Sequence, residues 1–333
     1  MVSHGSHGAG YRDRVTVAHG SRSFPAPLPI DLRLTLSPLR HGRGDPTIRL
    51  GRQAMIRAAR TPEGPATLHL RLEGSTISAE AWGPGQAWAL ETAPELLGAE
   101  DDPSALAPAD PVVARLRRRL AGLRMPRSSG VWEAVLPAIL EQKVTGREAR
   151  SSFRRIVRAF GESAPGPFGE GVPASRSGTR TAAPFGVRLI PSPERIAAMP
   201  AYAFHRFGVE ARRAAVIRAV AAIGTRLNAS ARPEAETTRR RMRSIPGIGP
   251  WTDAEVARVT FGDADAVSVG DFHLPSAVSW ALAGEPRADD ARMLELLEPY
   301  RGQRGRVSLM IEIGGPPAPR FGPRMPVRSI EAL

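Results

Sequence analysis

The chain of 333 residues is 42% hydrophobic and 24% charged, a globular composition that is too long for one ordinary core, so we expect two or three compact units. The absence of cysteine excludes disulfides, zinc–cysteine sites and iron–sulfur clusters. The seven histidines show no metal-ligand spacing, and the sequence lacks the run of 18 apolar residues that would predict a membrane span. The formal net charge of +13 favours a polyanionic partner, nucleic acid before an anionic membrane surface, although a solvated basic surface would have the same charge.

The N-terminal part of the chain is predicted to be β-rich. Residues 1–29 are polar, with Gly, His and Pro, and we expect them to be disordered. From residue 30 onward, alternation of apolar and polar residues predicts strands, two of them joined as a hairpin by Glu73-Gly74-Ser75. The predicted strands are 32–36, 67–72 and 76–82, and a short helix is predicted over 87–97. We therefore expect a small β-rich α+β domain over 30–104.

Helices dominate the prediction after an acidic, Pro-rich stretch at 101–111. A mostly α-helical core is expected over 105–315, with a flexible insertion at about 161–187 and a tail at 316–333. Ser192 and Pro193 predict a helix N-cap and first residue. Apolar residues at helical spacing predict helices over 112–122, 131–160 (two helices broken near Thr145-Gly146), 209–226, 233–244, 250–260, 271–283, 289–298 and near 303–313. The predicted fold class is α+β.

The segment Ser244-Ile245-Pro246-Gly247-Ile248-Gly249-Pro250-Trp251-Thr252 predicts a tight turn between two helices. Gly247 and Gly249 let the backbone approach a partner closely and adopt positive φ without steric cost, while Ile245 and Ile248 would anchor the turn to the core. The second helix would present unpaired N–H groups and the positive end of its dipole, which together bind an anion such as a phosphate. The same residues are also compatible with a helix–helix turn that binds no ligand.

A second segment, Asp265–Leu274, leads through Gly270 to Asp271 and then into a predicted helix. We expect Asp271 at the N-cap of that helix, where aspartate is common for purely local reasons. Its position about twenty residues after the hairpin points to a further role that the cap alone does not require.

The two segments together resemble the helix-hairpin-helix plus Gly/Pro-Asp signature of the base-excision DNA glycosylase superfamily, and the bacterial DNA-3-methyladenine glycosylase II branch is the most similar to this sequence. Trp132–Phe160 and Ile190–Glu194 resemble a helix pair and the next helix start of that branch, and the β-rich unit is similar to its first domain. The resemblance extends over most of residues 30–313, and the motif pair is more specific for the superfamily than for the branch. It implies that the core at 105–315 is a helix-hairpin-helix glycosylase core.

The resemblance implies that Asp271 is the catalytic carboxylate, and the chemistry of the reaction is consistent with that role. Breaking an N-glycosidic bond builds positive charge on the sugar, which a nearby carboxylate stabilises while it orients or deprotonates the attacking water. An alkylated purine is already cationic and leaves as a neutral base, so it needs no strong general acid. Because the bond is inaccessible inside the duplex, the nucleotide must be flipped out.

Trp251 stands where lyase-competent members of the superfamily carry a lysine, one residue before Thr252. The resemblance therefore implies a monofunctional enzyme without AP-lyase activity. Trp251 is placed to stack on a flipped base, and packing of the hairpin is the alternative role for it. The other residues expected in the base pocket are Trp132, Phe272 and Tyr300.

The expected DNA contacts lie in three places: Gly247, Ile248, Gly249 and Thr252 of the hairpin, Gln142 and Lys143 at the turn where the branch inserts a wedge side chain, and Arg301 and Arg304. Lys143 is the only lysine of the chain. Its stem would fill the gap left by the flipped base or lie on the surface, and it is the one candidate for an unexpected Schiff base.

The stretch Tyr300–Arg306 departs from the branch, which has aromatic residues there, so the substrate range stays open. His273 is either a proton donor to a neutral base or a surface residue.

We therefore expect a monomeric enzyme that acts on alkylated purines of the 3-methyladenine and 7-methylguanine type in double-stranded DNA. It would be cytoplasmic and nucleoid-associated in a bacterium, with no membrane partner, no metal site and no cofactor except a monovalent cation that the hairpin backbone would be able to hold. Two alternatives remain: a non-catalytic helix-hairpin-helix DNA-binding module, and a glycosylase for deaminated or oxidised bases.

Overall fold

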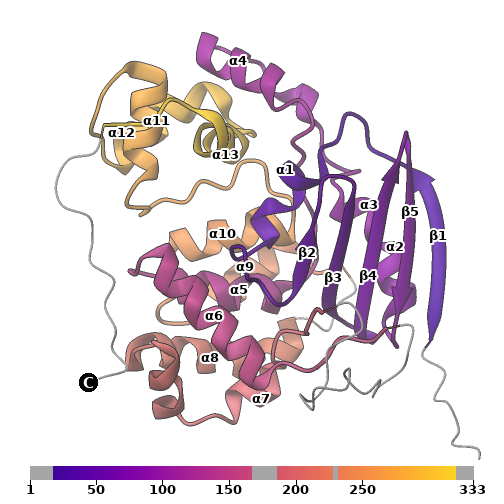
Figure 1. The fold of residues 1–333 in the computed structure, drawn as a ribbon. Helices are drawn as coiled ribbons and strands as arrows, with labels where there is room; N and C mark the ends of the chain where they lie inside the picture. The colour runs from indigo at the N-terminus through magenta and orange to yellow at the C-terminus, as the bar shows by residue number, and fades with distance from the viewer. Residues whose placement is uncertain (1–17, 167–185, 228–231, 320–333) are drawn as a thin grey trace, which may run out of the picture.

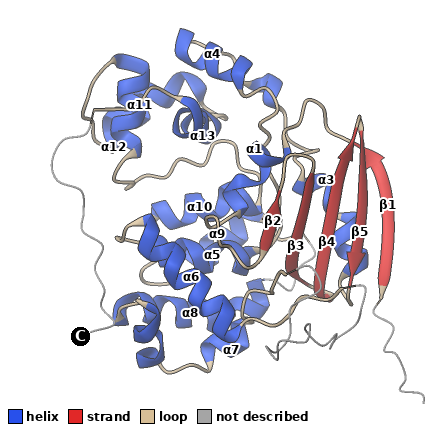
Figure 2. Ribbon diagram, viewed as in Figure 1, coloured by secondary structure: helices blue, strands red, loops and turns tan. Residues whose placement is uncertain are grey.

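The computed structural model describes residues 18–166, 186–227 and 232–319, and it contains an antiparallel sheet followed by helices (Figures 1 and 2). The sheet has five strands in the order β1-β5-β4-β3-β2. Their bounds are β1 His19–Pro25, β2 Ile48–Leu50, β3 Ala54–Thr61, β4 Gly64–Glu73 and β5 Thr76–Trp82. The predicted α+β fold class is therefore confirmed, together with the hairpin that joins β4 and β5.

One face of the sheet is buried, because apolar residues alternate along its strands. Leu68 and Leu70 of β4 and Ile77 and Ala79 of β5 all lie in one core cluster with residues of the covering helices. Those helices are α1 Leu32–Leu36, α2 Gln86–Glu91 and α3 Ala93–Leu96. Helices α2 and α3 confirm the short helix predicted over 87–97, now divided into two.

Two predictions for the N-terminal part are wrong. Residues 32–36 form helix α1 and not a strand, because the Asp31 carboxylate accepts hydrogen bonds from the N–H groups of Arg33 and Leu34 and so starts a helix. Predicted disorder over 1–29 is contradicted at His19–Pro25, which pairs along its whole length with β5. The sheet thus begins at His19, ahead of the predicted start at residue 30, and residues 1–17 lie outside the described residues.

The helical part follows the predicted order closely. Its helices are α4 Pro111–Arg119, α5 Val131–Glu141, α6 Gly146–Phe160, α7 Pro193–Ala197, α8 Ala211–Leu227, α9 Ala235–Arg243, α10 Pro250–Thr260, α11 Leu274–Ala283, α12 Asp290–Leu297 and α13 Arg304–Gly314. Short 3-10 helices cover Ser37–Leu39, Pro103–Ala105, Ala201–Phe207 and Glu298–Tyr300. Ser192 caps α7 with Pro193 as its first residue, as the sequence predicts. In the predicted insertion, residues 167–185 lie outside the described residues, and Ser163 pairs with Arg188 across it.

The helices pack around two separate cores. One contains residues of α5, α6, α8 and α10, and the other contains residues of α4, α11, α12 and α13. Figure 1 shows the α11–α13 group with α4 above the α5–α10 group, with the sheet beside both. The hairpin and Asp271 lie on the chain segment that passes from the first group to the second. None of the helices in the described ranges has the length and hydropathy needed to span a membrane.

Candidate active site

The predicted hairpin is present between α9 and α10, and glycine is required at its first turn position. Gly247 has φ +100°, and a Cβ atom added there would lie 2.4 Å from Cγ2 of Val216 on α8. Both the backbone conformation and the close approach therefore exclude a side chain. Ile248 is buried in the α5–α10 core and Ile245 packs against it, so the two isoleucines anchor the turn as expected.

The start of α10 is open. Gly249 is its N-cap and Pro250 its first residue, and no side chain accepts a hydrogen bond from the first turn. A Cβ atom added at Gly249 would meet nothing within 4 Å. The first turn of this 11-residue helix therefore has no side-chain cap, and the backbone at Gly249 is not covered by a side chain.

An ion pair holds the two hairpin helices together. Arg239 of α9 donates to both carboxylate oxygens of Asp253 in the first turn of α10, and to Asp263 beyond the end of α10. Asp253 is buried, and its hydrogen bonds raise the pKa of the Arg239 guanidinium. The pair links α9 to the first turn of α10. Removing either partner would leave a buried charge uncompensated, so the link should resist disruption.

Asp271 lies against the hairpin helix. Its Oδ2 accepts a hydrogen bond from Nε1 of Trp251 at 3.1 Å, and its Oδ1 accepts from the N–H groups of His273 at 2.7 Å and Leu274 at 2.9 Å. Helix α11 begins at Leu274 with His273 as its N-cap residue, so the prediction that Asp271 occupies the N-cap position is wrong by two residues. Its side chain nevertheless bonds the first-turn N–H groups, and one carboxylate thus joins the starts of α10 and α11.

The turn after α5 contacts the hairpin through Gln142. Its Nε2 donates to the carbonyl of Gly247 and to Oγ1 of Thr252, both at 2.9 Å. The adjacent Lys143 is exposed and has φ +54°, in the left-handed region that a lysine rarely adopts. The structure therefore places Gln142 and Lys143 beside the hairpin, although Gln142 and Gly247 are 105 residues apart in the sequence.

Two aromatic residues expected in the base pocket are core residues instead. Trp132 is fully buried within the α5–α10 core, where its Nε1 donates to the carbonyl of Pro191 at 2.8 Å. Tyr300 is 4% exposed and packs in the second core, and burial together with the negative charge of Asp110 raises the pKa of its phenol. Both predictions fail because these side chains face inward from their helices.

The two expected arginines are held by carboxylates. Arg304 forms hydrogen bonds with both oxygens of Asp265 through Nε and Nη2. Burial alone would raise the pKa of Asp265, but the hydrogen bonds from Arg304 and Gly302 outweigh it and leave that pKa lowered. Arg301 is exposed and pairs with Glu298. Arg304 is thus a structural residue in this state, and Arg301 remains at the surface.

Phe272 and His273 protrude from the site. Phe272 is 88% exposed, and its ring lies edge-on to that of His273 with 4.9 Å between ring centroids. An exposed phenylalanine next to Asp271 does not form a pocket wall in this structure.

Sequence reasoning missed a group of ionisable side chains near Asp271. Glu255 and Arg258 of α10 form an ion pair, Ser268 donates to Glu255, and Arg258 also lies 3.8 Å from Oε2 of Glu312 on α13. Burial raises the pKa of the Glu312 carboxyl to about 7 against the effect of Arg258, and the charges of Glu255 and Asp271 raise it further. The spacing of Glu255 and Arg258 on one helix was a usable signal, but nothing in the sequence pointed to Glu312.

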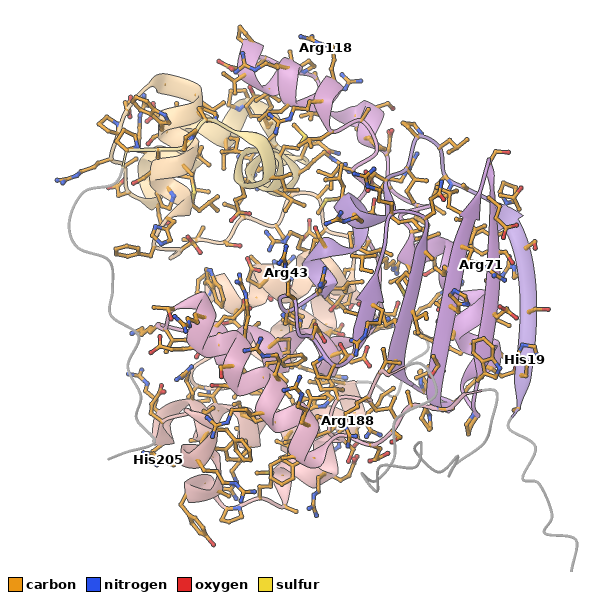
Figure 3. All side chains as sticks on the ribbon, in the orientation of Figure 1. His19, Arg43, Arg71, Arg118, Arg188 and His205 are labelled. Carbon is orange, nitrogen blue, oxygen red and sulfur yellow. The ribbon has the colours of Figure 1, made fainter. Side chains whose placement is uncertain are left out.

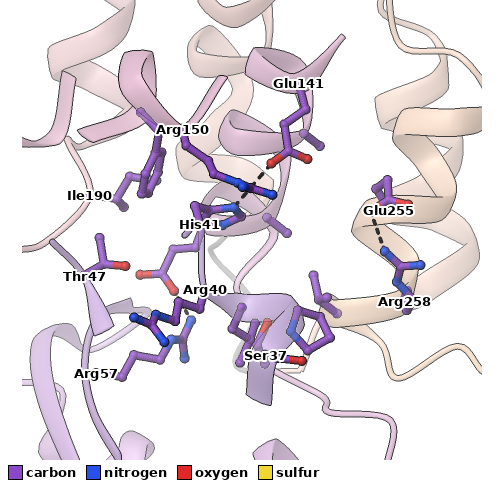
Figure 4. Close-up of a pocket in the computed structure, with 18 of the residues that line it drawn as sticks. Ser37, Arg40, His41, Thr47, Arg57, Glu141, Arg150, Ile190, Glu255 and Arg258 are labelled. Carbon is purple, nitrogen blue, oxygen red and sulfur yellow. Dashed lines mark hydrogen bonds and ion pairs between the residues drawn. The ribbon is translucent and has the colours of Figure 1, made fainter. Parts of the chain in front are cut away.

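A polar cavity of about 210 Å³ lies behind α10, between the sheet and helices α5 and α6 (Figure 4). Glu255 and Arg258 line it from α10, and the other charged residues of its lining are Arg40, His41, Arg57, Glu133, Glu141 and Arg150. The cavity does not include Trp251 or Asp271. Arg258 therefore lines this cavity and also lies within 3.8 Å of Glu312.

Charge and metal-ligand patterns do not locate the site by themselves. Basic side chains are spread over the sheet and the helices, as Arg71 on β4, Arg118 on α4 and Arg188 show (Figure 3). Within the described ranges, no three His, Asp or Glu side chains gather as metal ligands would. The hairpin and Asp271 are defined instead by backbone geometry and the hydrogen bonds above.

Solved structures of other proteins share the fold of this chain. A 3-methyladenine DNA-glycosylase from Archaeoglobus fulgidus superposes with a TM-score of 0.68 at 18% identity, covering 87% of this chain and 96% of that one. The Clostridium acetobutylicum 8-oxoguanine glycosylase/lyase, in complex with double-stranded DNA, gives a TM-score of 0.62 at 12% identity, covering 90% of this chain and 97% of that one.

Sequence comparison finds a curated relative in Mycobacterium tuberculosis, named "Probable bifunctional transcriptional activator/DNA repair enzyme AlkA", which is 27% identical over 183 residues. The match covers 54% of this chain and 34% of the relative, so the chain spans about a third of the length of that protein. No family model matches. The chain has the fold of the helix-hairpin-helix DNA glycosylases, the superfamily that its sequence resembles.

Proposed function

We propose that the chain is a monofunctional DNA glycosylase that removes alkylated purines from duplex DNA as the first step of base excision repair. The observation that carries the proposal is the hydrogen bond from Trp251 Nε1 to Asp271 Oδ2, which joins the hairpin helix to a carboxylate twenty residues further along the chain. A simple helix cap needs no such partner. The glycosylase fold and the relative described as a DNA repair enzyme support the same function.

The carboxylate of Asp271 would act on the sugar of a flipped nucleotide. Three hydrogen bonds, from Trp251, His273 and Leu274, fix the orientation of its two oxygens. When the N-glycosidic bond lengthens, positive charge grows on the sugar, and a fixed carboxylate stabilises it without reorganisation. The same carboxylate takes a proton from the water that attacks C1′.

Trp251 would have two roles. Its indole N–H holds Asp271, and its half-buried ring next to that carboxylate is available to stack on an electron-poor cationic base. A tryptophan cannot form a Schiff base, so catalysis from this position is hydrolytic. Lys143, the only lysine, remains the single candidate for a covalent intermediate.

DNA would approach along the hairpin. The open start of α10 at Gly249 would bind a phosphate, and Arg240, Arg241 and Arg243 of α9 are exposed beside it. Phe272 would contact the DNA next to the flipped nucleotide. A monovalent cation at the hairpin carbonyls, a monomeric state and a cytoplasmic, nucleoid-associated location are further parts of this proposal.

Base release tests the proposal directly. Wild-type protein incubated with a duplex containing one 7-methylguanine should release the free base and leave an abasic site. Asp271→Asn, which keeps the shape of the side chain, should slow release by about 100-fold or more. Glu73→Gln, at an exposed carboxylate on the sheet, is the matched control and should leave release unchanged. Unaltered release by Asp271→Asn would contradict the catalytic assignment.

The same experiment separates the alternatives. A non-catalytic binding module would bind the duplex without releasing base in either variant. A lyase would cleave the strand and be trapped on DNA by borohydride, and loss of trapping in Lys143→Ala would identify the covalent residue. We expect base release without trapping.

A further inference from the structure

A groove of about 500 Å³ runs along β2, which is the edge strand of the sheet on the side of the helices (Figure 1). Its walls come from β2, β3, the loop 40–45 and the last turn of α6. We call it the β2 groove. Neither the hairpin nor Asp271 lines it, so it is separate from the proposed active site.

Positive charge dominates the β2 groove. Its charged lining residues are Arg40, Arg43, Arg49, Arg158 and one acid, Asp45. The Asp45 carboxylate is buried, and it accepts hydrogen bonds from the backbone N–H groups of His41 and Thr47. None of the four arginines has an ion pair with a carboxylate in the part of the chain that the structure describes, and Arg43 and Arg158 are exposed. The groove therefore offers guanidinium groups to an anionic ligand.

Two glycines hold the arginine-rich loop against further arginines of α6. A Cβ atom added at Gly42, which has φ +85°, would lie 2.8 Å from Cδ of Arg150, and one added at Gly44 would lie 3.0 Å from Cδ of Arg154. With Arg158, these arginines recur every four residues and share one face of α6. Like charges gathered so closely repel one another, and an anion between them relieves that repulsion.

The floor of the β2 groove is apolar and borders a free strand edge. Half-buried Leu50 and Ile56 both line it. The N–H of Gly51 donates to the carbonyl of Ala54 on β3, and peptide groups alternate in direction along an antiparallel strand, so those of Leu50 point away from β3. Among the described residues, the backbone of Leu50 has no hydrogen-bond partner. The groove thus combines cations, apolar surface and an unpaired strand edge.

We propose that the β2 groove binds an extended acidic peptide of a partner protein. The peptide backbone would pair with Leu50 as an added strand. Successive side chains of an extended peptide point to opposite faces, so apolar ones would lie on the floor while carboxylates reach the arginines. Arginine pairs with a carboxylate through two parallel hydrogen bonds, which gives the site both charge and geometric selectivity. This inference goes beyond the proposed function and does not depend on it.

Other anionic or flexible occupants fit the β2 groove less well. A DNA strand would satisfy the arginines, but its phosphodiester backbone has no N–H group to donate to the carbonyl of Leu50, which would be covered without a partner. The segments of this chain outside the described ranges lack the required charge, because in 1–17, 167–185 and 320–333 arginines outnumber acidic residues. An acidic peptide of another protein matches both the charge and the strand edge.

Fluorescence anisotropy with a fluorescein-labelled hexapeptide of alternating Asp and Val tests the proposal. Wild-type protein should bind this peptide at least about tenfold more tightly than the Asn–Val peptide, which has the same shape without the charge. The double variant Arg43→Gln/Arg158→Gln should lose about tenfold or more in affinity for the Asp–Val peptide. Arg118→Gln, at an exposed arginine of α4 far from the groove, is the matched control and should bind as the wild type does (Figure 3). Equal affinity for the two peptides, or an unaffected double variant, would overturn the proposal.

Amide NMR shifts locate the bound peptide. The Asp–Val peptide should shift the amide signals of Leu50 and of the loop 40–45 and leave that of Gly249 in the hairpin unchanged. A shift at Gly249 without one at Leu50 would contradict the assigned groove.

Undamaged duplex DNA is the other arm of the test. The double variant should bind the duplex within about twofold of the wild type, and the duplex should not displace the peptide. A duplex that displaces the peptide and binds the double variant about tenfold more weakly would assign the groove to DNA and overturn the proposal. Release of 7-methylguanine by the double variant should match the wild type, whereas a wild-type protein that binds the peptide but releases no base would refute the proposed function alone.

Discussion

Two segments that the sequence marks as functional differ in where their side chains point. In the hairpin, the backbone at Gly249 is open and Trp251 reaches the carboxylate of Asp271. In the C-terminal stretch 300–306, Tyr300 is buried and Arg304 is bound to Asp265. The difference shows that a basic and aromatic pattern does not by itself identify a ligand surface.

The reason lies in the range of the interactions. The hairpin depends on glycines, a helix start and two anchoring isoleucines, all within a few residues, so local sequence determines it. Arg306 has its partner, Asp101, more than two hundred residues away, and burial lowers the pKa of this arginine while Asp101 opposes that effect. Such a partner is not evident from the arginine pattern, and only the fold reveals it.

The largest expected effect compares the two tryptophans that were predicted to share one pocket. Trp132→Ala should lower the free energy of unfolding by about 3–5 kcal/mol, because it removes a fully buried ring and leaves the carbonyl of Pro191 without its donor. Trp251→Ala should cost about 1 kcal/mol of stability but most of the base release. Urea denaturation and a release assay at matched folded fractions check both. A Trp132→Ala protein of wild-type stability would contradict its place in the core.

The fold itself was largely predictable, for physical reasons that single residues illustrate. Ser192 caps α7 as the sequence predicts, because a cap acts within three residues, and α6 starts at the break that the sequence predicts near Thr145. Leu32–Leu36 was mistaken for a strand because a five-residue apolar pattern fits both periods, and the deciding contact is the Asp31 cap. At the site, Gln142 was predictable only by resemblance, and Glu312 not at all, because its setting is created by α10 and Asp271.

The two hairpin glycines offer the next comparison. Gly247→Ala should destabilise the protein by about 3 kcal/mol, since it combines a positive φ with a clash against Val216. Gly249 has φ −98°, and a Cβ atom added there would meet nothing within 4 Å, so Gly249→Ala should leave the stability unchanged. Its methyl group would instead cover the start of α10 and weaken duplex binding by about tenfold. Thermal unfolding and fluorescence anisotropy measure the two effects, and unchanged DNA affinity in Gly249→Ala would refute the phosphate site.

A smaller effect concerns the ion pair between Arg304 and Asp265. The folded-state pKa of Asp265 is lowered from its ordinary value of 3.8, so the pair stabilises the protein above that pH and the contribution is lost as pH falls through the folded-state pKa. Asp265→Asn should therefore cost about 1 kcal/mol at pH 7, and the two proteins should converge in stability in acid. Urea midpoints at several pH values test this. A constant difference down to pH 2 would show that the carboxylate does not contribute through its charge.

Lys143 should give a small change in stability and a change of only a few fold in DNA binding. Its φ of +54° costs a lysine about 1 kcal/mol relative to glycine, and the greater freedom of glycine in the unfolded chain offsets this, so Lys143→Gly should alter stability by less than about 0.5 kcal/mol. Lys143→Ala retains the strain but, like Lys143→Gly, lacks the ammonium group. If that group contacts a phosphate, both variants should bind duplex DNA a few fold more weakly, with the salt slope reduced by about one. Wild-type affinity in Lys143→Ala combined with weaker binding in Lys143→Gly would assign the effect to the backbone, and would place the lysine side chain at the surface without a role in DNA binding.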